Sequence, residues 1–134
     1  MYFQTETKKE EKAWREVKIH KRFMNAFRGM YVFYKTSRHF YILILGKIVV
    51  IVLGFVLKVS NIEWVALFFA IGFVVVTEVF NTAIEIDIDL TSPEFHPYAR
   101  DTKDVSAAAV VISIFTVIIV GLIIFLPKIY NVLI

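Results

Sequence analysis

The chain has 134 residues, of which 58% are hydrophobic and 16% aromatic, and this composition is too apolar for an ordinary soluble domain. It contains no cysteine, which excludes disulfides and thiolate metal ligands. The net charge of +3 is uneven, because residues 1–39 hold ten Lys and Arg against four Glu, whereas residues 40–134 hold five against eight acidic residues. We therefore expect a membrane protein with a basic amino-terminal part.

Residues 10–36 are predicted to form an amphipathic surface helix, after a disordered or tag-like tail over residues 1–9, whose first four residues are either native or a tag remnant. Large apolar side chains recur at helical spacing at Phe23, Phe27, Met30 or Tyr31, and Tyr34. Two interpretations use this same face: a helix lying in the membrane interface, with basic residues toward anionic headgroups, or a helix packed on its own bundle. Nucleic-acid binding is disfavoured because the basic residues adjoin a membrane span.

Residues 37–134 are predicted to form a transmembrane domain of three helices, with spans at about 40–57, 64–86 and 105–126. Each run can cross about 30 Å of hydrocarbon as a helix, although Lys47 interrupts the first. Because Lys and Arg accumulate on the cytoplasmic side of spans, we expect the amino terminus and the loop before residue 105 inside, and the loop near Lys58 and the carboxyl terminus outside. The fold class is therefore an all-α integral membrane protein.

Four carboxylates occupy the end of the second span, in the sequence TEVFNTAIEIDIDL over residues 77–90. On a helix, Glu78, Asn81 and Glu85 share one face, and Asp89 continues it. Glu78 and Glu85 are about 10 Å apart along the helix axis, a separation that suits two different chemical roles better than one shared proton. Near water, Glu85 can hold a hard cation such as Mg²⁺, whereas Glu78, deeper in the span, suits a general base. The alternative is that these acids only pair with basic residues of neighbouring helices, and it is favoured for Asp87 and Asp89.

The segment HPYARDTKDVSAAAV, residues 96–110, is the second candidate site. Asp101 is expected to cap the third span, with Asp104 in its first turn. A lysine there opposes the helix dipole, so Lys103 is expected either to bind nucleotide phosphates or to snorkel to headgroups. Small residues follow at 106–109 and favour close helix packing, and His96 is expected in a turn or exposed. No Gly-rich phosphate loop is present in the sequence, which excludes a soluble-kinase mechanism.

The motifs EVFNTAIE (residues 78–85) and HPYARDTKDVSAAAV (residues 96–110) resemble those of the prokaryotic diacylglycerol kinase and undecaprenol kinase family. The similarity to the family begins at about Phe23, with an F-x-x-A-x-x-G pattern that ends at Gly29. It also includes the dipeptide K-T before the first span and the tripeptide I-E-W that ends at Trp64.

This resemblance implies a homotrimeric enzyme of the bacterial cytoplasmic (inner) membrane that transfers the γ-phosphate of ATP to a lipid hydroxyl, with Mg²⁺ as cofactor. It implies Glu78 as the catalytic base, Glu85 as the metal ligand, and a nucleotide site formed by Asn81, Glu85, Lys103 and Asp104. Glu78 and Ser106 are the expected lipid-binding residues. Undecaprenol is the favoured lipid and diacylglycerol the next, and no nucleic acid is expected as a partner.

One departure from the family pattern bears on activity. The chain reads K-T-S-R-H-F where the family usually reads K-T-E-R-N-F, so Ser37 replaces a second metal-binding glutamate and His39 replaces an asparagine. The alternative function is therefore a catalytically silent homologue with a structural or regulatory role. A transporter or proton relay is a further alternative, disfavoured because the acids cluster at one membrane side and no broken helix pair is visible.

Overall fold

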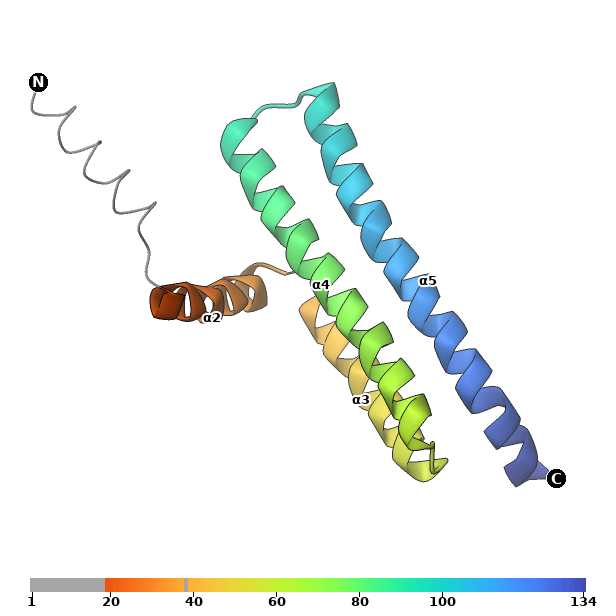
Figure 1. The fold of residues 1–134 in the computed structure, drawn as a ribbon. Coiled ribbons are helices and arrows are strands. Elements are labelled where there is room, and N and C mark those ends of the chain that lie inside the picture. The colour runs from red at the N-terminus through yellow and green to blue at the C-terminus, as the bar shows by residue number, and fades with distance from the viewer. Residues whose placement is uncertain (1–18, 38) are drawn as a thin grey trace, which may run out of the picture. The chain divides into compact units, whose positions relative to one another are not determined.

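The computed structural model describes residues 19–37 and 39–134, which are all-helical as predicted. The helices are, in chain order, α2 (Ile19–Thr36), α3 (Phe40–Val56), α4 (Asn61–Thr91) and α5 (Pro97–Leu133) (Figure 1). The chain divides into two compact units, Met1–Lys35 and Thr36–Ile134, which we describe separately. The predicted tail and the first part of the predicted surface helix, residues 10–18, lie outside the described residues.

Helix α2 makes up the described part of the first unit. Its predicted aromatic face is exposed, with Phe23 and Phe27 at 66% and 76% of their full accessibility, while Phe33 is buried. Lys35 in the last turn suits the negative end of the helix dipole, and its Nζ lies 5.0 Å from the ring centroid of Tyr31. The amphipathic helix is thus present from Ile19, and its interfacial location stays a prediction.

Two of the helices in the described residues, α4 and α5, are each long and apolar enough to cross a membrane, and the number is three if α3 is counted together with α2. The 31 residues of α4 and the 37 of α5 correspond to about 46 and 56 Å at the usual rise of 1.5 Å per residue. Both exceed the hydrocarbon thickness of about 30 Å. These helices therefore continue past the membrane core into the polar regions.

The tight turn between α3 and α4 is closed by backbone hydrogen bonds at both helix ends. After α3, the Lys58 N–H donates to the carbonyl of Phe55 and the Val59 N–H to that of Gly54, which is the Schellman pattern. Lys58 itself takes a left-handed conformation with φ 49°. Ser60 then caps α4 through a capping box with Glu63. These caps bring α4 back alongside α3.

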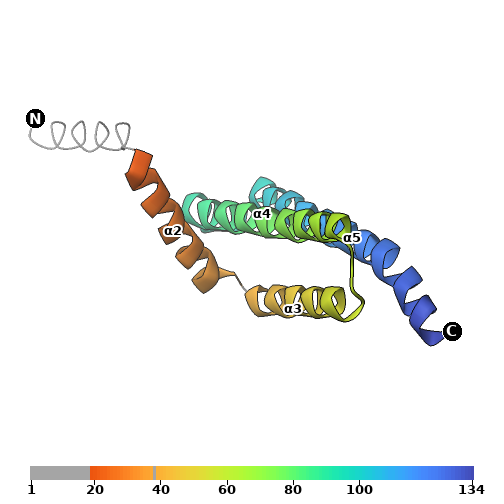
Figure 2. The ribbon, with the colours of Figure 1, turned by 60° about the horizontal axis from the view of Figure 1, so that its bottom comes forward.

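Within the second unit, α4 packs mainly on α5, and the two lie side by side in both views (Figures 1 and 2). The apolar core lies near the α3–α4 turn and consists of Val59, Leu67, Ile124 and Phe125. At the same end, Lys128 Nζ lies 3.0 Å from Glu63 Oε2. The other end of the α4–α5 pair carries the acidic residues of α4, so core and candidate site occupy opposite ends.

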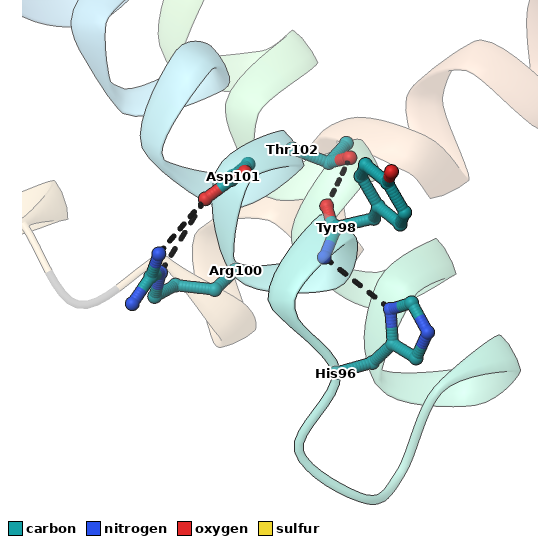
Figure 3. A network of polar contacts seen from close by, with 5 residues as sticks. All are labelled: His96, Tyr98, Arg100, Asp101 and Thr102. Atoms are coloured by element: carbon teal, nitrogen blue, oxygen red, sulfur yellow. Dashed lines mark hydrogen bonds and ion pairs between the residues drawn. The ribbon is translucent and has the colours of Figure 1, made fainter.

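The beginning of α5 differs from the sequence-based expectation. His96 is the N-cap, and its Nδ1 accepts from the Tyr98 N–H at 3.3 Å (Figure 3). Pro97 follows at the first helical position, where its fixed φ suits a helix and its missing N–H removes no bond. Asp101 therefore lies inside the helix, on its surface, with Oδ1 3.2 Å from Arg100, and its prediction as the cap is wrong.

This earlier helix start also changes the position of Lys103. The residue lies in the second turn of α5, beyond the reach of the first-turn dipole effect. The first turn of α5 thus contains neither Lys103 nor Asp104, and the expectation that both lie there is wrong.

Candidate active site

One face of α4 changes from apolar to polar along its length. The buried residues follow helical spacing: Leu67, Ala70, Val74, Glu78, Asn81 and Thr82. The last three are polar and keep exposed fractions of 3%, 9% and 4%. A polar stretch on the packing face of an otherwise apolar helix is costly unless it is hydrogen-bonded or functional.

A chain of hydrogen bonds joins α5 to this face. Ser106 Oγ, itself buried, donates to Asn81 Oδ1 at 2.7 Å, and Asn81 Nδ2 donates to Glu85 Oε1 at 3.2 Å. Because a carboxylate can only accept, Glu85 fixes which side of the amide carries the nitrogen. The oxygen then faces Ser106, so the three side chains form one directed array.

Glu78 lies one turn before Asn81 and makes no hydrogen bond or ion pair with any described residue. It is 3% exposed, and its carboxylate interacts electrostatically with His39 and Glu85. A buried ionisable group at membrane depth that is held in no ion pair is a functional candidate by default. Among the described residues, helix-to-helix pairing thus does not account for Glu78.

Lys103 and Asp89 form an ion pair across the turn between α4 and α5. The contact is partly exposed, with 38% of the lysine side chain and 69% of the aspartate accessible. Asp87 is exposed, and Asp104 is exposed with no polar contact to a described side chain. Direct hydrogen bonds therefore join three of the predicted residues, Asn81, Glu85 and Ser106. Lys103 lies one helical turn before Ser106. Asp104 makes no polar contact with these residues.

Two further residues near this site were not singled out for a role there by the sequence reasoning. Ser113 is fully buried on α5, and its hydroxyl lies 2.8 Å from that of Thr77, next to Glu78. In the sequence, the feature that points to Ser113 is a serine inside an apolar span. His39, at the start of α3, was noted only as a departure from a motif, and its electrostatic interaction with Glu78 depends on helix packing.

Comparison with known proteins identifies the family. A sequence profile described as prokaryotic diacylglycerol kinase matches residues 24–125. The chain belongs to the prokaryotic diacylglycerol kinase family. The undecaprenol kinase of Bacillus subtilis (strain 168) is 39% identical to it over 108 residues, which cover 81% of this chain and 88% of the relative.

Diacylglycerol kinases match over shorter segments. That of Helicobacter pylori (strain ATCC 700392 / 26695) is 39% identical over 64 residues, covering 48% of this chain and 50% of the relative. That of Pseudomonas aeruginosa is 33% identical over 87 residues, covering 65% of each. The resemblance seen in the sequence is confirmed, and the chain is a membrane lipid kinase.

A kinase of this family uses ATP and a divalent metal. Residues 19–37 and 39–134 contain no group of three or more Asp, Glu, His or Cys side chains placed to hold a metal by themselves. Glu85 is half-buried and uses only Oε1 toward Asn81, which leaves Oε2 available. Because Mg²⁺ in such sites takes one or two carboxylates and completes its shell with substrate phosphates and water, one free carboxylate oxygen is sufficient.

Proposed function

We propose that this kinase transfers the γ-phosphate of ATP to the hydroxyl of undecaprenol at the cytoplasmic face of the bacterial membrane. The observation that carries the proposal is the buried, unpaired Glu78, one turn from the Ser106–Asn81–Glu85 array. For the lipid, the support is the undecaprenol kinase of Bacillus subtilis, most of whose length is matched. Diacylglycerol is the second candidate substrate.

Glu78 is proposed as the general base. Phosphoryl transfer depends on positioning and charge neutralisation, and the lipid hydroxyl becomes a better acceptor when a carboxylate takes its proton. Glu78 makes no hydrogen bond or ion pair with a described residue, so its carboxylate is not held in a fixed pair, although His39 interacts with it electrostatically.

Glu85 is proposed to hold the magnesium ion through Oε2, while Asn81 keeps the other oxygen oriented. The ion, when bound, supplies positive charge against the phosphates. Asn81, Glu85, Lys103 and Asp104 are proposed as the nucleotide site. Lys103 would exchange Asp89 for a phosphate, which is feasible because the pair is partly exposed. A homotrimer is proposed from family membership.

The test is phosphorylation with labelled ATP in mixed micelles, offering undecaprenol and diacylglycerol in parallel. We expect label in undecaprenol, and a loss of at least 100-fold in Glu78→Gln, since general base catalysis contributes about 10²- to 10⁴-fold. Thermal unfolding of the variant in the same detergent should stay unchanged or rise, because the substitution removes a buried charge. Wild-type activity in Glu78→Gln would overturn the role of Glu78, and label only in diacylglycerol would overturn the substrate.

The second candidate, a catalytically silent homologue, is favoured by one observation, the serine at position 37. It predicts that the protein binds Mg-ATP yet labels neither lipid. A Ser37→Glu variant distinguishes the two: label that appears only after this substitution means that the missing carboxylate limits activity.

A further inference from the structure

The ion pair between Lys103 and Asp89 joins one residue of the proposed nucleotide site to a residue with no proposed role there. Asp89 lies in the last turn of α4, where a negative charge opposes the helix dipole. Lys103 supplies the opposite charge from α5, across the turn between the two helices. This compensation gives the contact a structural role, and the geometry of the pair adds a second one.

The pair holds the ammonium of Lys103 away from Glu85. Ser106 is bonded to Asn81, and the two helices run antiparallel (Figure 1). Lys103 lies one turn before Ser106, so its backbone lies across from the turn of α4 that follows Asn81 and reaches Glu85. Its ammonium, however, pairs with Asp89, four residues and about 6 Å further along the axis of α4. Helical side chains lean toward the N-terminus of their own helix, which directs the lysine toward the α4–α5 turn.

The Lys103–Asp89 pair is open enough to exchange its partner. Its side chains are 38% and 69% accessible, whereas both side chains of the Glu63–Lys128 pair at the other end of these helices are 26% accessible. Ion pairs that are exposed to water are weak, and a lysine carries its charge on a flexible stem. The ammonium can therefore move from Asp89 to a phosphate beside Glu85.

We propose that Asp89 is a positioning residue that competes with nucleotide phosphates for the ammonium of Lys103 and thereby lowers the affinity of the kinase for Mg-ATP. This inference rests on the proposed nucleotide site. When phosphates bind beside Glu85, the ammonium leaves Asp89 for them, and the ion pair forms again when the nucleotide departs. The free energy of the pair is lost on binding and regained on release, so Asp89 favours nucleotide release.

The test is equilibrium binding of Mg²⁺ with the non-hydrolysable imido analogue of ATP to the full chain in detergent micelles, measured by calorimetry. Asp89→Asn keeps the size of the side chain and removes its charge. We expect the Kd to fall about two- to fivefold, because an exposed ion pair contributes at most about 1 kcal/mol, and about 1.4 kcal/mol corresponds to tenfold. Asp89→Glu keeps the charge and should bind like the parent protein.

Matched variants separate competition for the lysine from general repulsion of the nucleotide. Asp87→Asn removes the same charge from an exposed position on the same helix, which forms no ion pair with a described residue, and it should lower the Kd less than Asp89→Asn does. Lys103→Met should weaken binding. In the Lys103→Met background, Asp89→Asn should have no larger effect than Asp87→Asn, because no ammonium is left to compete for.

Each outcome decides the proposal. Tighter binding that is specific to Asp89→Asn and requires Lys103 supports it, and a loss of folding cannot imitate such a gain. Unchanged or weaker binding in Asp89→Asn, or equal gains in Asp87→Asn and Asp89→Asn, would overturn it while leaving Lys103 in the nucleotide site. Unchanged binding in Lys103→Met would instead remove the lysine from the proposed nucleotide site, and the competition would be overturned with it.

Discussion

Asn81 is held from both sides of its amide by groups of different chemistry. Glu85 accepts from its nitrogen, and Ser106 donates to its oxygen. The serine hydroxyl has one proton, and the carbonyl of Lys103, 2.8 Å away, is an alternative acceptor. The hydrogen bonds thus link Glu85 to a hydroxyl on the neighbouring helix, and we propose Ser106 as a positioning residue.

We predict that Ser106→Ala weakens the apparent affinity for Mg-ATP by about 10-fold, in the range found when groups that orient metal ligands are removed. Without the hydroxyl, the amide of Asn81 loses the bond that fixes its oxygen and can turn away from Glu85. The measurement is the dependence of initial rate on Mg-ATP at saturating lipid, so that KM is separated from kcat.

Ser113→Ala is the matched control for this prediction. It deletes a hydroxyl that is also buried on the same helix but bonded to Thr77. Thr77 keeps carbonyl acceptors on its own helix, so the stability loss should be about 0.6 kcal/mol, typical of bonds between membrane helices. An unchanged KM for Mg-ATP in Ser106→Ala, or an equal rise in both variants, would contradict the positioning role.

The sequence predicted correctly that three of the candidate residues share a helical face. The spacing of Glu78, Asn81 and Glu85 places them on one helical face, because that depends only on the helix period. The bond from Ser106 could not be predicted, since it depends on the register of α5 against α4. Lys103 was singled out for an incorrect reason, because the cap formed by His96 starts α5 earlier than expected.

At the scale of the helices, the turn between α3 and α4 is specified by steric fit as well as by caps. A Cβ on Gly54 would lie 2.5 Å from Cη2 and 2.8 Å from Cζ2 of Trp64, so the indole lies directly on the backbone of α3. The carbonyl of Gly54 also accepts the N–H of Val59, which is buried in the core. One glycine therefore serves both the cap and the approach of α4.

We predict that Gly54→Ala lowers the free energy of unfolding by about 1–3 kcal/mol, the usual effect of an added methyl in a packed site. The added Cβ requires the Trp64 ring to move. The measurement is unfolding in mixed micelles with increasing SDS. Trp64→Phe in the same background should recover part of the loss, because phenylalanine lacks the outer ring atoms of the indole.

Gly46→Ala is the control on the same helix, since its Cβ would meet open space. It should be neutral or stabilising by up to about 1 kcal/mol, because alanine reduces the freedom of the unfolded chain. Equal effects at positions 46 and 54 would mean that the ring contact does not limit the approach of α4 to α3.

The helices themselves were predictable from apolar run length, but their ends were not. The second span was expected to end near residue 86, whereas α4 continues to Thr91, whose hydroxyl bonds back to the carbonyl of Asp87. It stops where Ser92 precedes Pro93, because the helical conformation is disfavoured for a residue before proline. Hydropathy marks where the membrane ends, whereas α4 ends where its cap and the following proline lie.

At the scale of the transmembrane unit, ion pairs join α4 to α5 near both ends. Glu63 pairs with Lys128 at one end and Asp89 with Lys103 at the other. The two acids are about 39 Å apart along α4 at 1.5 Å per residue, more than the hydrocarbon thickness of about 30 Å. The two ion pairs can thus lie in the interfacial regions of opposite leaflets, so α4 and α5 are long enough to cross the whole membrane between them.

This arrangement gives the proposed function a strict requirement, because ATP reaches only the cytoplasmic end. The array around Glu85 lies at the end that includes the α4–α5 turn, so that turn must be inside. The absence of cysteine from the chain allows single cysteines to report orientation. Glu94→Cys in this turn and Asn61→Cys at the start of α4 both replace exposed residues.

We predict that a membrane-impermeant maleimide labels Asn61→Cys in intact spheroplasts and labels Glu94→Cys only after permeabilisation. The positive-inside rule gives the same orientation, because the ten Lys and Arg of residues 1–39 precede the first span. The cysteine-free parent protein is the control for background, and both variants must keep lipid phosphorylation. Labelling of Glu94→Cys in intact spheroplasts would place Glu85 on the side without ATP, and the proposed site could not then work as a kinase, whatever its geometry.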